Sequence, residues 1–523
     1  MDSNSPKSLI LVLNFGGQYC HLIARRVRDL GVRSEIVPNN APASAIAAMK
    51  PSGIILSGGP SSVYEHGAPT VDSGIFGLGV PILGICYGHQ LLALKTGGRV
   101  EKGKTKEYGA NQITLSKEAK NSLLLSGLSP TENVWLSHGD WVSGVGGGFA
   151  ITAKSADGIT AAVENPGKRF YGVQFHPEVV HTEHGKEMLE NFVFKICKCK
   201  KNWQPEMLEK QLETQVAALV GDKQVLMAVS GGVDSTVAAT IIHRAIGNRL
   251  HCVFIDHGLL RKNEAAEVCE FFEKKLKFKN FHFVDASNAF LSKLDGVGDP
   301  EEKRRIIGHT FIEVFEQKAR ELKEKHGEIA FLGQGTIYPD RIESAQPSAQ
   351  AAKIKSHHNL TLPEKMSLRL IEPLRELYKD EVRQLGTKMG LPKELLWRHP
   401  FPGPGLAIRV VGEFSREKLE ICREADAIFI EELRKNKLYD KTWQAFAAVL
   451  PVKTVGVMGD SRTYAFAIAL RAVTSIDGMT ADWAKLPLGF AEKVSNRIVN
   501  EVKGANRVFY DVTQKPPGTI EYE

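Results

Sequence analysis

The segment 224–235, which reads QVLMAVSGGVDS, constrains the fold of this chain more than any other twelve residues. A short apolar run ends in Ser230-Gly231-Gly232, and apolar residues resume at helical spacing from Val237 to Ile242. This order predicts a buried strand, a glycine-rich loop and a helix. Such a loop offers backbone N–H groups and a positive helix N-terminus to an anion. The segment therefore predicts a parallel α/β unit with a phosphate-binding loop that has no lysine.

A carboxylate in the same loop indicates a metal ion as well as a phosphate. Asp234 would repel phosphate unless a divalent cation lay between them, so we expect Mg²⁺ at Asp234 together with a nucleotide. An ordinary strand-to-helix turn is the alternative, since these are also turn and cap residues. The segment resembles the SGGxDS loop of the ATP pyrophosphatase family, whose members split ATP to AMP and pyrophosphate. That resemblance implies ATP binding by Ser230, Gly231, Gly232, Val233, Asp234 and Ser235.

Composition excludes several classes of protein. The 523 residues exceed a single core, and 43% hydrophobic and 24% charged residues are typical of a soluble globular chain. No 18-residue apolar run occurs, the start MDSNSPKS lacks a basic region followed by an apolar stretch, and seven cysteines form no regular framework. We therefore expect a cytoplasmic protein without a membrane partner. The net charge of +7 is too diluted over this length to indicate nucleic-acid binding.

The pattern of apolar runs predicts an α/β chain of three domains. Residues 8–200 open with alternating strands and helices, as in a doubly wound sheet, and residues 206–398 show the same alternation for a parallel sheet. The cluster HPFPGPG begins a smaller α+β domain, residues 399–523. Residues 340–366 have neither helical nor strand period and are expected to form a mobile lid. The expected strands are 9–15, 53–60, 80–86, 169–175, 224–230, 250–256, 280–286, 328–334, 445–459 and 464–475.

A second candidate site surrounds one cysteine. In Gly84-Ile85-Cys86-Tyr87-Gly88 the thiol follows a buried strand and precedes a helix, which predicts a nucleophile elbow with cysteine in place of serine. A buried structural cysteine is the alternative. His176 and Glu178 follow another strand, and two residues apart in an extended segment point to one side. We expect His176 to take the thiol proton while Glu178 orients the imidazole.

The sequences GICYGHQ and FHPEV resemble the class I glutamine amidotransferases, which hydrolyse glutamine through a cysteine thioester and release ammonia. The resemblance implies that Cys86, His176 and Glu178 are catalytic. It also implies that backbone N–H groups of Gly59 and Tyr87 bind the oxyanion, and that Gln90 lines the glutamine pocket.

Two other patterns match known motifs by letter only. Residues 98–105 satisfy G-x4-G-K-T, but a helical segment precedes them and no apolar helix follows, so no phosphate site is expected there. His181 and His184, interpreted as helical, and the pair Cys197 and Cys199 have no common zinc-ligand spacing.

Three segments of the last third, RHPFPGPG, VGVMGD and KPPGTIE, resemble the GMP synthetase family. The resemblance implies that XMP is adenylylated at O2 by ATP and Mg²⁺, that ammonia displaces AMP to give GMP, and that the last domain forms a homodimer. No tightly bound organic cofactor is implied. Lys515 could hold the XMP phosphate as a point charge, although a solvated tail is the alternative. The implied XMP-binding residues are Arg261, Gln444, Lys515 and Glu521.

The chain departs from that family in two places. Leu360-Thr361 stand where a glycine pair is usual, just after the lid segment 354–359, and His257 stands where asparagine is usual. Two other functions are possible on the same motifs: adenylylation of an RNA base, and glutamine sensing without catalysis. The fused glutaminase and the lack of a concentrated basic face count against the first. The intact cysteine site and phosphate loop count against the second.

Overall fold

The computed structural model describes residues 8–345, 368–458, 461–475, 478 and 480–523. The chain forms two compact units, Met1–Gln204 and Pro205–Glu523. The predicted lid segment 354–359 and the Leu360-Thr361 departure lie outside the described residues. No helix among the described ranges is long and apolar enough to cross a membrane.

The first unit is built on a nine-stranded sheet of order β2-β1-β3-β4-β9-β8-β7-β5-β6. The strands from β2 to β9 in that order pair in parallel, and the rest pair antiparallel. Fully buried strands such as Leu9–Asn14 place the core on both faces of the parallel part. The elements are β1 Leu9–Asn14, α1 Cys20–Asp29, β2 Arg33–Pro38, α2 Ala43–Ala48, β3 Gly53–Leu56, β4 Ile82–Ile85, α3 Tyr87–Lys95, β5 Arg99–Leu115, β6 Thr131–Gly144, β7 Ala150–Ser155, β8 Thr160–Asn165, β9 Phe170–Val173 and α4 Gly185–Glu190.

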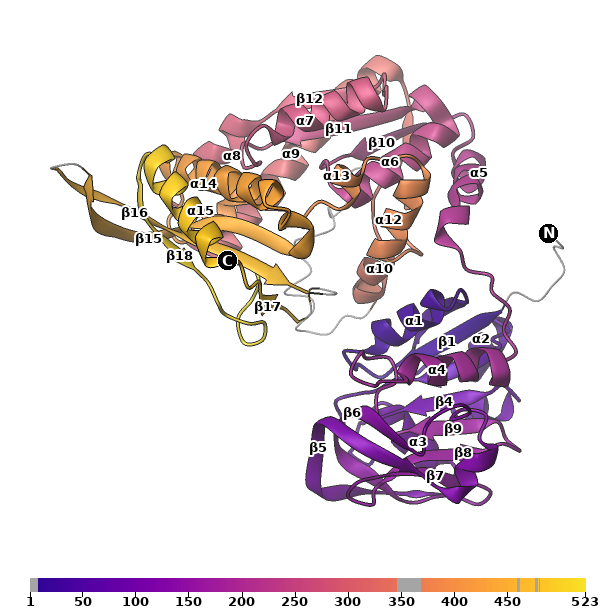
Figure 1. Ribbon diagram of the computed structural model, residues 1–523. Helices are drawn as coiled ribbons and strands as arrows, with labels where there is room; N and C mark the ends of the chain where they lie inside the picture. The colour runs from indigo at the N-terminus through magenta and orange to yellow at the C-terminus, as the bar shows by residue number, and fades with distance from the viewer. Residues whose placement is uncertain (1–7, 346–367, 459–460, 476–477, 479) are drawn as a thin grey trace. The chain divides into compact units, whose positions relative to one another are not determined.

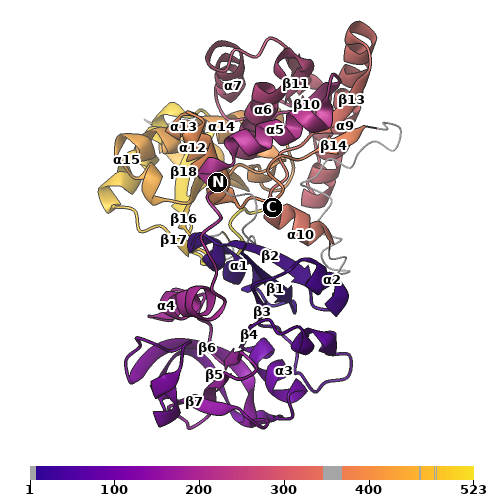
Figure 2. The same ribbon diagram turned by 90° about the vertical axis from the view of Figure 1, so that its right-hand side faces the viewer.

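The second unit begins with a five-stranded parallel sheet of order β12-β11-β10-β13-β14. Parallel strands need crossover connections, and helices supply them here. Figure 2 shows α5 and α6 side by side near β10. The elements are α5 Glu209–Val220, β10 Gln224–Ala228, α6 Val233–Ile246, β11 Leu250–Asp256, α7 Glu264–Glu270, β12 Phe281–Asp285, α8 Ser287–Leu294, α9 Pro300–His326, β13 Ile329–Gly333, α10 Tyr338–Ala345, β14 Arg369–Ile371, α12 Lys379–Lys388 and α13 Lys393–Leu396.

A smaller sheet completes the second unit. Its strands β15 and β16 form a long antiparallel ribbon, and β18 pairs with β16 in parallel. Helices α14 and α15 pack against one another and against this sheet, and the ribbon extends beyond them (Figure 1). One core joins it to the parallel sheet, since Leu226 and Phe290 share a cluster with Phe429 and Ile468. The elements are α14 Arg416–Lys435, β15 Gln444–Met458, β16 Ser461–Thr474, β17 Asp482–Trp483, α15 Leu488–Glu501 and β18 Ala505–Tyr510.

The predicted α/β alternation is confirmed, while two local predictions are wrong. Residues 340–345 belong to helix α10 and are not irregular, and His181 and His184 precede helix α4 instead of lying on it. The G-x4-G-K-T letters lie at the start of strand β5 with no helix after them, as their context predicted. The boundary between residues 398 and 399 stays a prediction.

Candidate active sites

Cys86 lies in the tight turn between β4 and α3. Its φ of 53° and ψ of −107° are strained for a residue with a side chain. A methyl group on Gly84 would lie 2.4 Å from the Gly88 carbonyl oxygen, and one on Gly88 would lie 2.2 Å from that of Leu56. Both glycines are therefore required by close backbone contacts, and the turn has the geometry of a nucleophile elbow.

His176 and Glu178 lie next to this cysteine. The Nδ1 atom of His176 is 2.8 Å from Oε1 of Glu178, and both residues are buried. A methyl group on Gly58 would lie 3.3 Å from Cε1 of His176 and 3.8 Å from Cβ of Cys86, so the two side chains meet at this glycine. The predicted contact between His176 and Glu178 is thus present. The ring of Tyr19 packs edge-on against the imidazole at 5.0 Å.

The electrostatics favour a protonated His176. Burial lowers the pKa of His176, but the Glu178 charge and the contact with Cys86 outweigh it and raise the pKa well above its ordinary value. A proton on this imidazole would stabilise a neighbouring thiolate. Oε2 of Glu178 is buried and has no hydrogen-bond partner within the described part of the chain.

The other residues predicted for this site surround the elbow. Tyr87 is the first residue of α3, where backbone N–H groups have no partner within the helix. A methyl group on Gly59 would lie 3.3 Å from Cγ of Tyr87, so these two residues are neighbours. The Gln90 amide donates to the Asp140 carbonyl at 2.9 Å and to Oε1 of Gln174 at 3.2 Å. Gln174, which the sequence did not single out, also donates to Sγ of Cys86 at 3.8 Å.

In the second unit the phosphate loop connects β10 to α6. Gly231 has a φ of 71°, and a methyl group there would lie 2.4 Å from Val268, so glycine is required. The Ser230 hydroxyl accepts from the Gly232 N–H at 3.3 Å and meets the Ser235 hydroxyl at 3.1 Å. Val233 is the first helical residue. The loop therefore places the first N–H groups of a 14-residue helix beside two hydroxyls, as an anion site requires.

Lysine approaches this loop from another segment. Nζ of Lys379, the first residue of α12, is 2.5 Å from Oδ2 of Asp234. Oδ1 of Asp234 is buried without a hydrogen-bond partner in the described ranges. The sequence of the loop gives no indication of Lys379, because Lys379 lies 145 residues after Asp234. The donor set of one free carboxylate oxygen suits a hard cation such as Mg²⁺, with Lys379 available to a phosphate.

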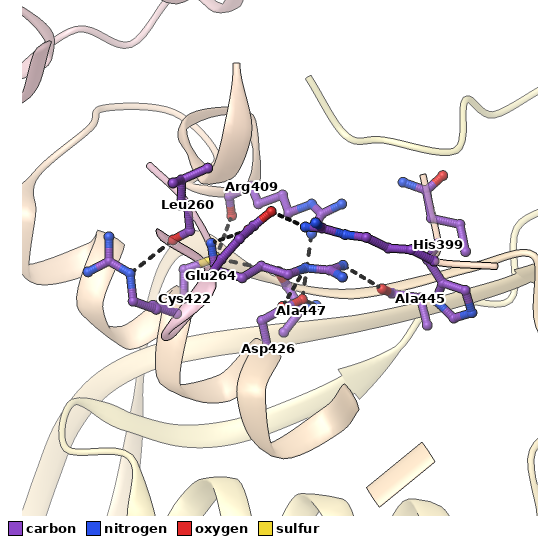
Figure 3. Close-up of polar contacts among 12 residues, drawn as sticks. Leu260, Glu264, His399, Arg409, Cys422, Asp426, Ala445 and Ala447 are labelled. Carbon is purple, nitrogen blue, oxygen red and sulfur yellow. Dashed lines mark hydrogen bonds and ion pairs between the residues drawn. The ribbon is translucent and has the colours of Figure 1, made fainter. Parts of the chain in front are cut away.

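Three of the four residues predicted to bind XMP lie on one polar network. Glu521 accepts two hydrogen bonds from Arg409, at 3.2 and 3.0 Å, and one from Gln444 at 2.6 Å. Asp426 pairs with Arg261 at 3.1 Å and with Arg409 at 3.6 Å. Figure 3 shows Arg409 and Asp426 in this network together with Glu264. Arg409 is fully buried and was missed, because an arginine in an apolar run carries no sequence signal of its own.

The network continues to the phosphate loop. Arg398 is paired with Glu264 and donates to the Gly231 carbonyl at 3.4 Å. Glu264 in turn accepts the backbone N–H of Arg261 at 2.9 Å. The guanidinium groups of Arg261 and Arg409 each lie 5.1 Å from the ring of Phe401. Charged groups therefore form a continuous path from the loop at Gly231 to Glu521.

Lys515 is outside this network. Its Nζ atom donates to the Gly478 carbonyl at 2.8 Å. A cavity of about 580 Å³ adjoins it, lined by Thr474, Ser475, Thr480, Ala481, Asp482, Gln514, Lys515 and Pro516. One backbone bridge, from Ala481 to Lys515, ties the segment to the smaller sheet. Lys515 is thus held by the fold instead of lying in a solvated tail.

The residues of the zinc alternative have other contacts. The ring of His181 lies 4.5 Å from that of Trp135 in a tilted arrangement, and Nδ1 of His184 lies 2.6 Å from Oε2 of Glu132. Among the described residues no group of three His, Cys, Asp or Glu side chains is arranged to hold a metal ion. His257, the departure from asparagine, accepts the Leu259 N–H at 3.0 Å, and burial lowers its pKa to about 4.

Three family descriptions match consecutive parts of the chain. Residues 11–196 match the class I glutamine amidotransferases, residues 205–305 match NAD synthase, and residues 431–522 match the GMP synthase C-terminal domain. The predicted fold class, an amidotransferase domain followed by a parallel-sheet unit and a smaller α+β part, is confirmed.

Full-length relatives agree with these matches. The chain is 55% identical over 517 residues to a protein of Carboxydothermus hydrogenoformans, and the match covers 99% of this chain and 100% of that protein. It is 55% identical to a protein of Aquifex aeolicus, over 98% of this chain and 99% of the relative. A protein of Clostridium kluyveri is 53% identical, and the match covers 99% of this chain and 100% of that protein. Each carries the name GMP synthase [glutamine-hydrolyzing], and the chain therefore belongs to the glutamine-hydrolysing GMP synthase family.

Proposed function

We propose that this chain makes GMP from XMP, with glutamine as the nitrogen donor and ATP as the activating substrate. The observation that carries the proposal is full-length similarity to GMP synthases combined with an intact cysteine elbow and an intact phosphate loop. Each of the two sites supplies one half of the reaction.

The cysteine site would hydrolyse glutamine. Cys86 attacks the carboxamide carbon after its proton has passed to His176, and the oxyanion is bound by the N–H groups of Gly59 and Tyr87. His176 then protonates the departing nitrogen, and ammonia is released. The thioester that remains on Cys86 is hydrolysed by water to glutamate and the free thiol. The 2.8 Å contact with Glu178 keeps the imidazole oriented through both steps. Gln90, which is fixed by Asp140 and Gln174, borders the glutamine pocket.

The second unit would activate XMP. Xanthine O2 attacks the α-phosphorus of ATP, pyrophosphate leaves, and ammonia then replaces AMP at C2 to give GMP. The loop 230–235 binds the leaving pyrophosphate through its N–H groups and hydroxyls, and Lys379 balances its charge. Arg261, Gln444 and Glu521 contact XMP, while Lys515 attracts its phosphate from the neighbouring cavity.

Asp234 would hold Mg²⁺ through its buried Oδ1 atom, which has no other partner in the described structure. When bound, the ion neutralises charge on the phosphates that leave. The salt bridge to Lys379 occupies the other carboxylate oxygen, Oδ2, and leaves Oδ1 for the ion.

One assay tests the function. Purified protein is given ATP and Mg²⁺ with either glutamine or ammonium, and with XMP or RNA as the acceptor; GMP, glutamate, bound glutamine and adenylylated RNA are measured. We expect GMP from both nitrogen sources, and from ammonium only after Cys86→Ala. Adenylylation of RNA without GMP would support the RNA-modifying alternative, glutamine binding without glutamate release would support a sensor, and no GMP from XMP under any condition would refute the proposal.

A homodimer is proposed on the exposed face of the β15–β16 ribbon. Val455, Val457 and Tyr464 are 57, 72 and 68% exposed, and Val455 pairs directly with Tyr464 across the strands. These side chains share one face because residues two apart in a strand point the same way. A second copy of the chain would cover this apolar face. Light scattering of Val457→Lys should show a monomer if the face is the interface, and an unchanged dimer would contradict it.

A reducing, cytoplasmic setting is also proposed. It is supported by the seven cysteines, all of which are unpaired.

A further inference from the structure

A buried lysine has no role in the steps above. Lys303 lies on α9, and its side chain is 0% exposed. Its ammonium group has three acceptors: the Val410 carbonyl at 2.7 Å, the Ala407 carbonyl at 3.4 Å and Oε2 of Glu523 at 2.5 Å. Three acceptors saturate the three N–H bonds of an ammonium group. The lysine is therefore fully satisfied although water is excluded.

These acceptors belong to two segments that meet at Glu521. Ala407 and Val410 lie on either side of Arg409 in the sequence, and the Arg409 guanidinium donates one hydrogen bond to each oxygen of the Glu521 carboxylate. Glu523 lies two residues after Glu521, and its second oxygen accepts the Gly412 N–H at 2.6 Å. A single ammonium group thus ties the segment that carries Arg409 to the segment that carries Glu521.

The location of α9 gives this contact a further consequence. Lys303 comes from the part of the chain built around the parallel sheet that carries the phosphate loop, whereas Glu521 follows the smaller sheet. Attack of O2 on the α-phosphorus requires the two nucleotides to be held at a fixed separation. Burial lowers the pKa of Lys303, and Glu523 opposes that effect.

We propose that Lys303 is a positioning residue of the XMP site, which acts through Glu523 and the Arg409 segment to hold the Glu521 carboxylate against the substrate nucleotide. The proposal rests on the proposed function, in which Glu521 contacts XMP. Lys303 itself touches no substrate.

The test compares Glu523→Gln with wild type in the ammonium-dependent reaction. Loss of one buried, charge-assisted contact should raise KM for XMP about tenfold. KM for ATP, and glutamate release at Cys86, should change by less than about twofold, since neither depends on Glu521. Glu523→Asp keeps the charge and should restore part of the XMP affinity. Lys303→Met combined with Glu523→Gln should cost little more than either change alone.

The matched control is an exposed lysine–glutamate pair. Lys293 contacts Glu313 at 2.7 Å, and the two side chains are 46 and 65% exposed. Lys293→Met and Glu313→Gln should leave KM for XMP unchanged. If Lys303 only stabilises the fold, Glu523→Gln will lower the melting temperature while KM for XMP stays at the wild-type value, and that result would overturn the proposal. Wild-type protein that makes no GMP would instead refute the proposed function. Should Lys303→Met fail to fold, Glu523→Gln still decides, because the amide is nearly isosteric.

Discussion

The cysteine site and the nucleotide site are built in different ways. The residues around Cys86 come from two short motifs at the ends of neighbouring parallel strands, β4 and β9. The residues around Glu521 come from α7, α14, the 398–409 segment and strand β15 of the smaller sheet. The first site depends on backbone turns, whereas the second depends on buried ion pairs such as Arg409 with Glu521.

This difference determines what a substitution should do. At the elbow, backbone atoms approach so closely that an added side-chain atom should disrupt the turn. In the second unit, loss of a charge should do the most damage, since removing the carboxylate partner of a buried arginine strongly destabilises the fold. Changes of shape should therefore damage the cysteine site most, and changes of charge should damage the nucleotide site most.

The largest effect is expected at Asp234. Asp234→Ala removes the only oxygen that we assign to Mg²⁺ and the partner of Lys379, so GMP formation should fall about 10³-fold with either nitrogen source. Glutamate release at Cys86 should remain, because it uses no phosphate. Both products are measured in one assay. The exposed Asp222, next to the same strand, provides the control Asp222→Ala, which should behave as wild type. Equal loss of both activities would show that the two sites are not separable.

The next effect is a change of shape without a change of charge. Gly88→Ala would place Cβ 2.2 Å from a backbone oxygen that cannot move freely, so we expect a loss of about 3 kcal/mol in unfolding free energy and little glutaminase activity. Gly147→Ala is the control, since nothing lies within 4 Å of its Cβ position. Denaturant unfolding and glutamate release measure both. A stable, active Gly88→Ala protein would mean that the elbow tolerates a different backbone path.

Much of the fold could be predicted because the parallel strands are apolar runs with glycine-rich ends. The ribbon β5–β6 was harder, since it is polar on one side. In the structure Val134, Leu136 and His138 are buried and alternate with more exposed neighbours, as in a half-buried strand, but the apolar Trp135 breaks that alternation in the sequence. Helix α10 was missed because its eight residues, YPDRIESA, have a proline at the second position and too few apolar residues to show a helical period.

Prediction of the site residues from the sequence was also limited to those marked by a local pattern. Cys86, His176 and Glu178 could be predicted from local spacing, because each motif ends a strand and parallel strand ends meet at one edge. Lys379, Arg409, Asp426 and Lys303 could not, because their partners are 17 to 220 residues away in a different element and no local pattern marks them. A single buried charged residue can be assigned to a site only from the folded structure, where its partner is known.

A smaller, selective effect is expected at Glu178. Glu178→Gln keeps the shape but removes the charge that raises the pKa of His176 against burial. The pKa of His176 should then fall, and glutamine-dependent GMP formation should drop roughly 30- to 100-fold. The pH profile of glutamate release should change, while the ammonium-dependent reaction should not. An unchanged profile would show that Glu178 does not control the protonation of His176.

The smallest expected effect is a loss of stability at low pH that comes from His251 and His282. The pKa values of these two histidines shift in the opposite direction to that of His176. Nδ1 of His251 lies 3.2 Å from Nε2 of His282, and the ring of His326 lies 4.6 Å from that of His251. Burial lowers the pKa of His251 and of His282 to about 4, and charges on His326 add to the effect, together with Lys318 and Lys325 at His282. His176 has a carboxylate neighbour instead, and its pKa is raised.

The sign of the pH dependence follows from these shifts. An unfolded histidine binds its proton near pH 6.5, so His251 and His282 favour the folded state above that pH and lose this contribution as the pH falls toward 4. His176 contributes below pH 6.5 and loses its contribution as the pH rises through its folded pKa. We expect the second unit to lose about 1–2 kcal/mol between pH 7 and pH 5, a value reduced because the imidazole of His282 is partly exposed to water. His282→Gln should reduce that slope, and the exposed His309→Gln should not. Hydrogen exchange of β11 and β12 at the two pH values measures it, and equal slopes in both variants would mean that the histidine cluster does not set the acid limit of this unit.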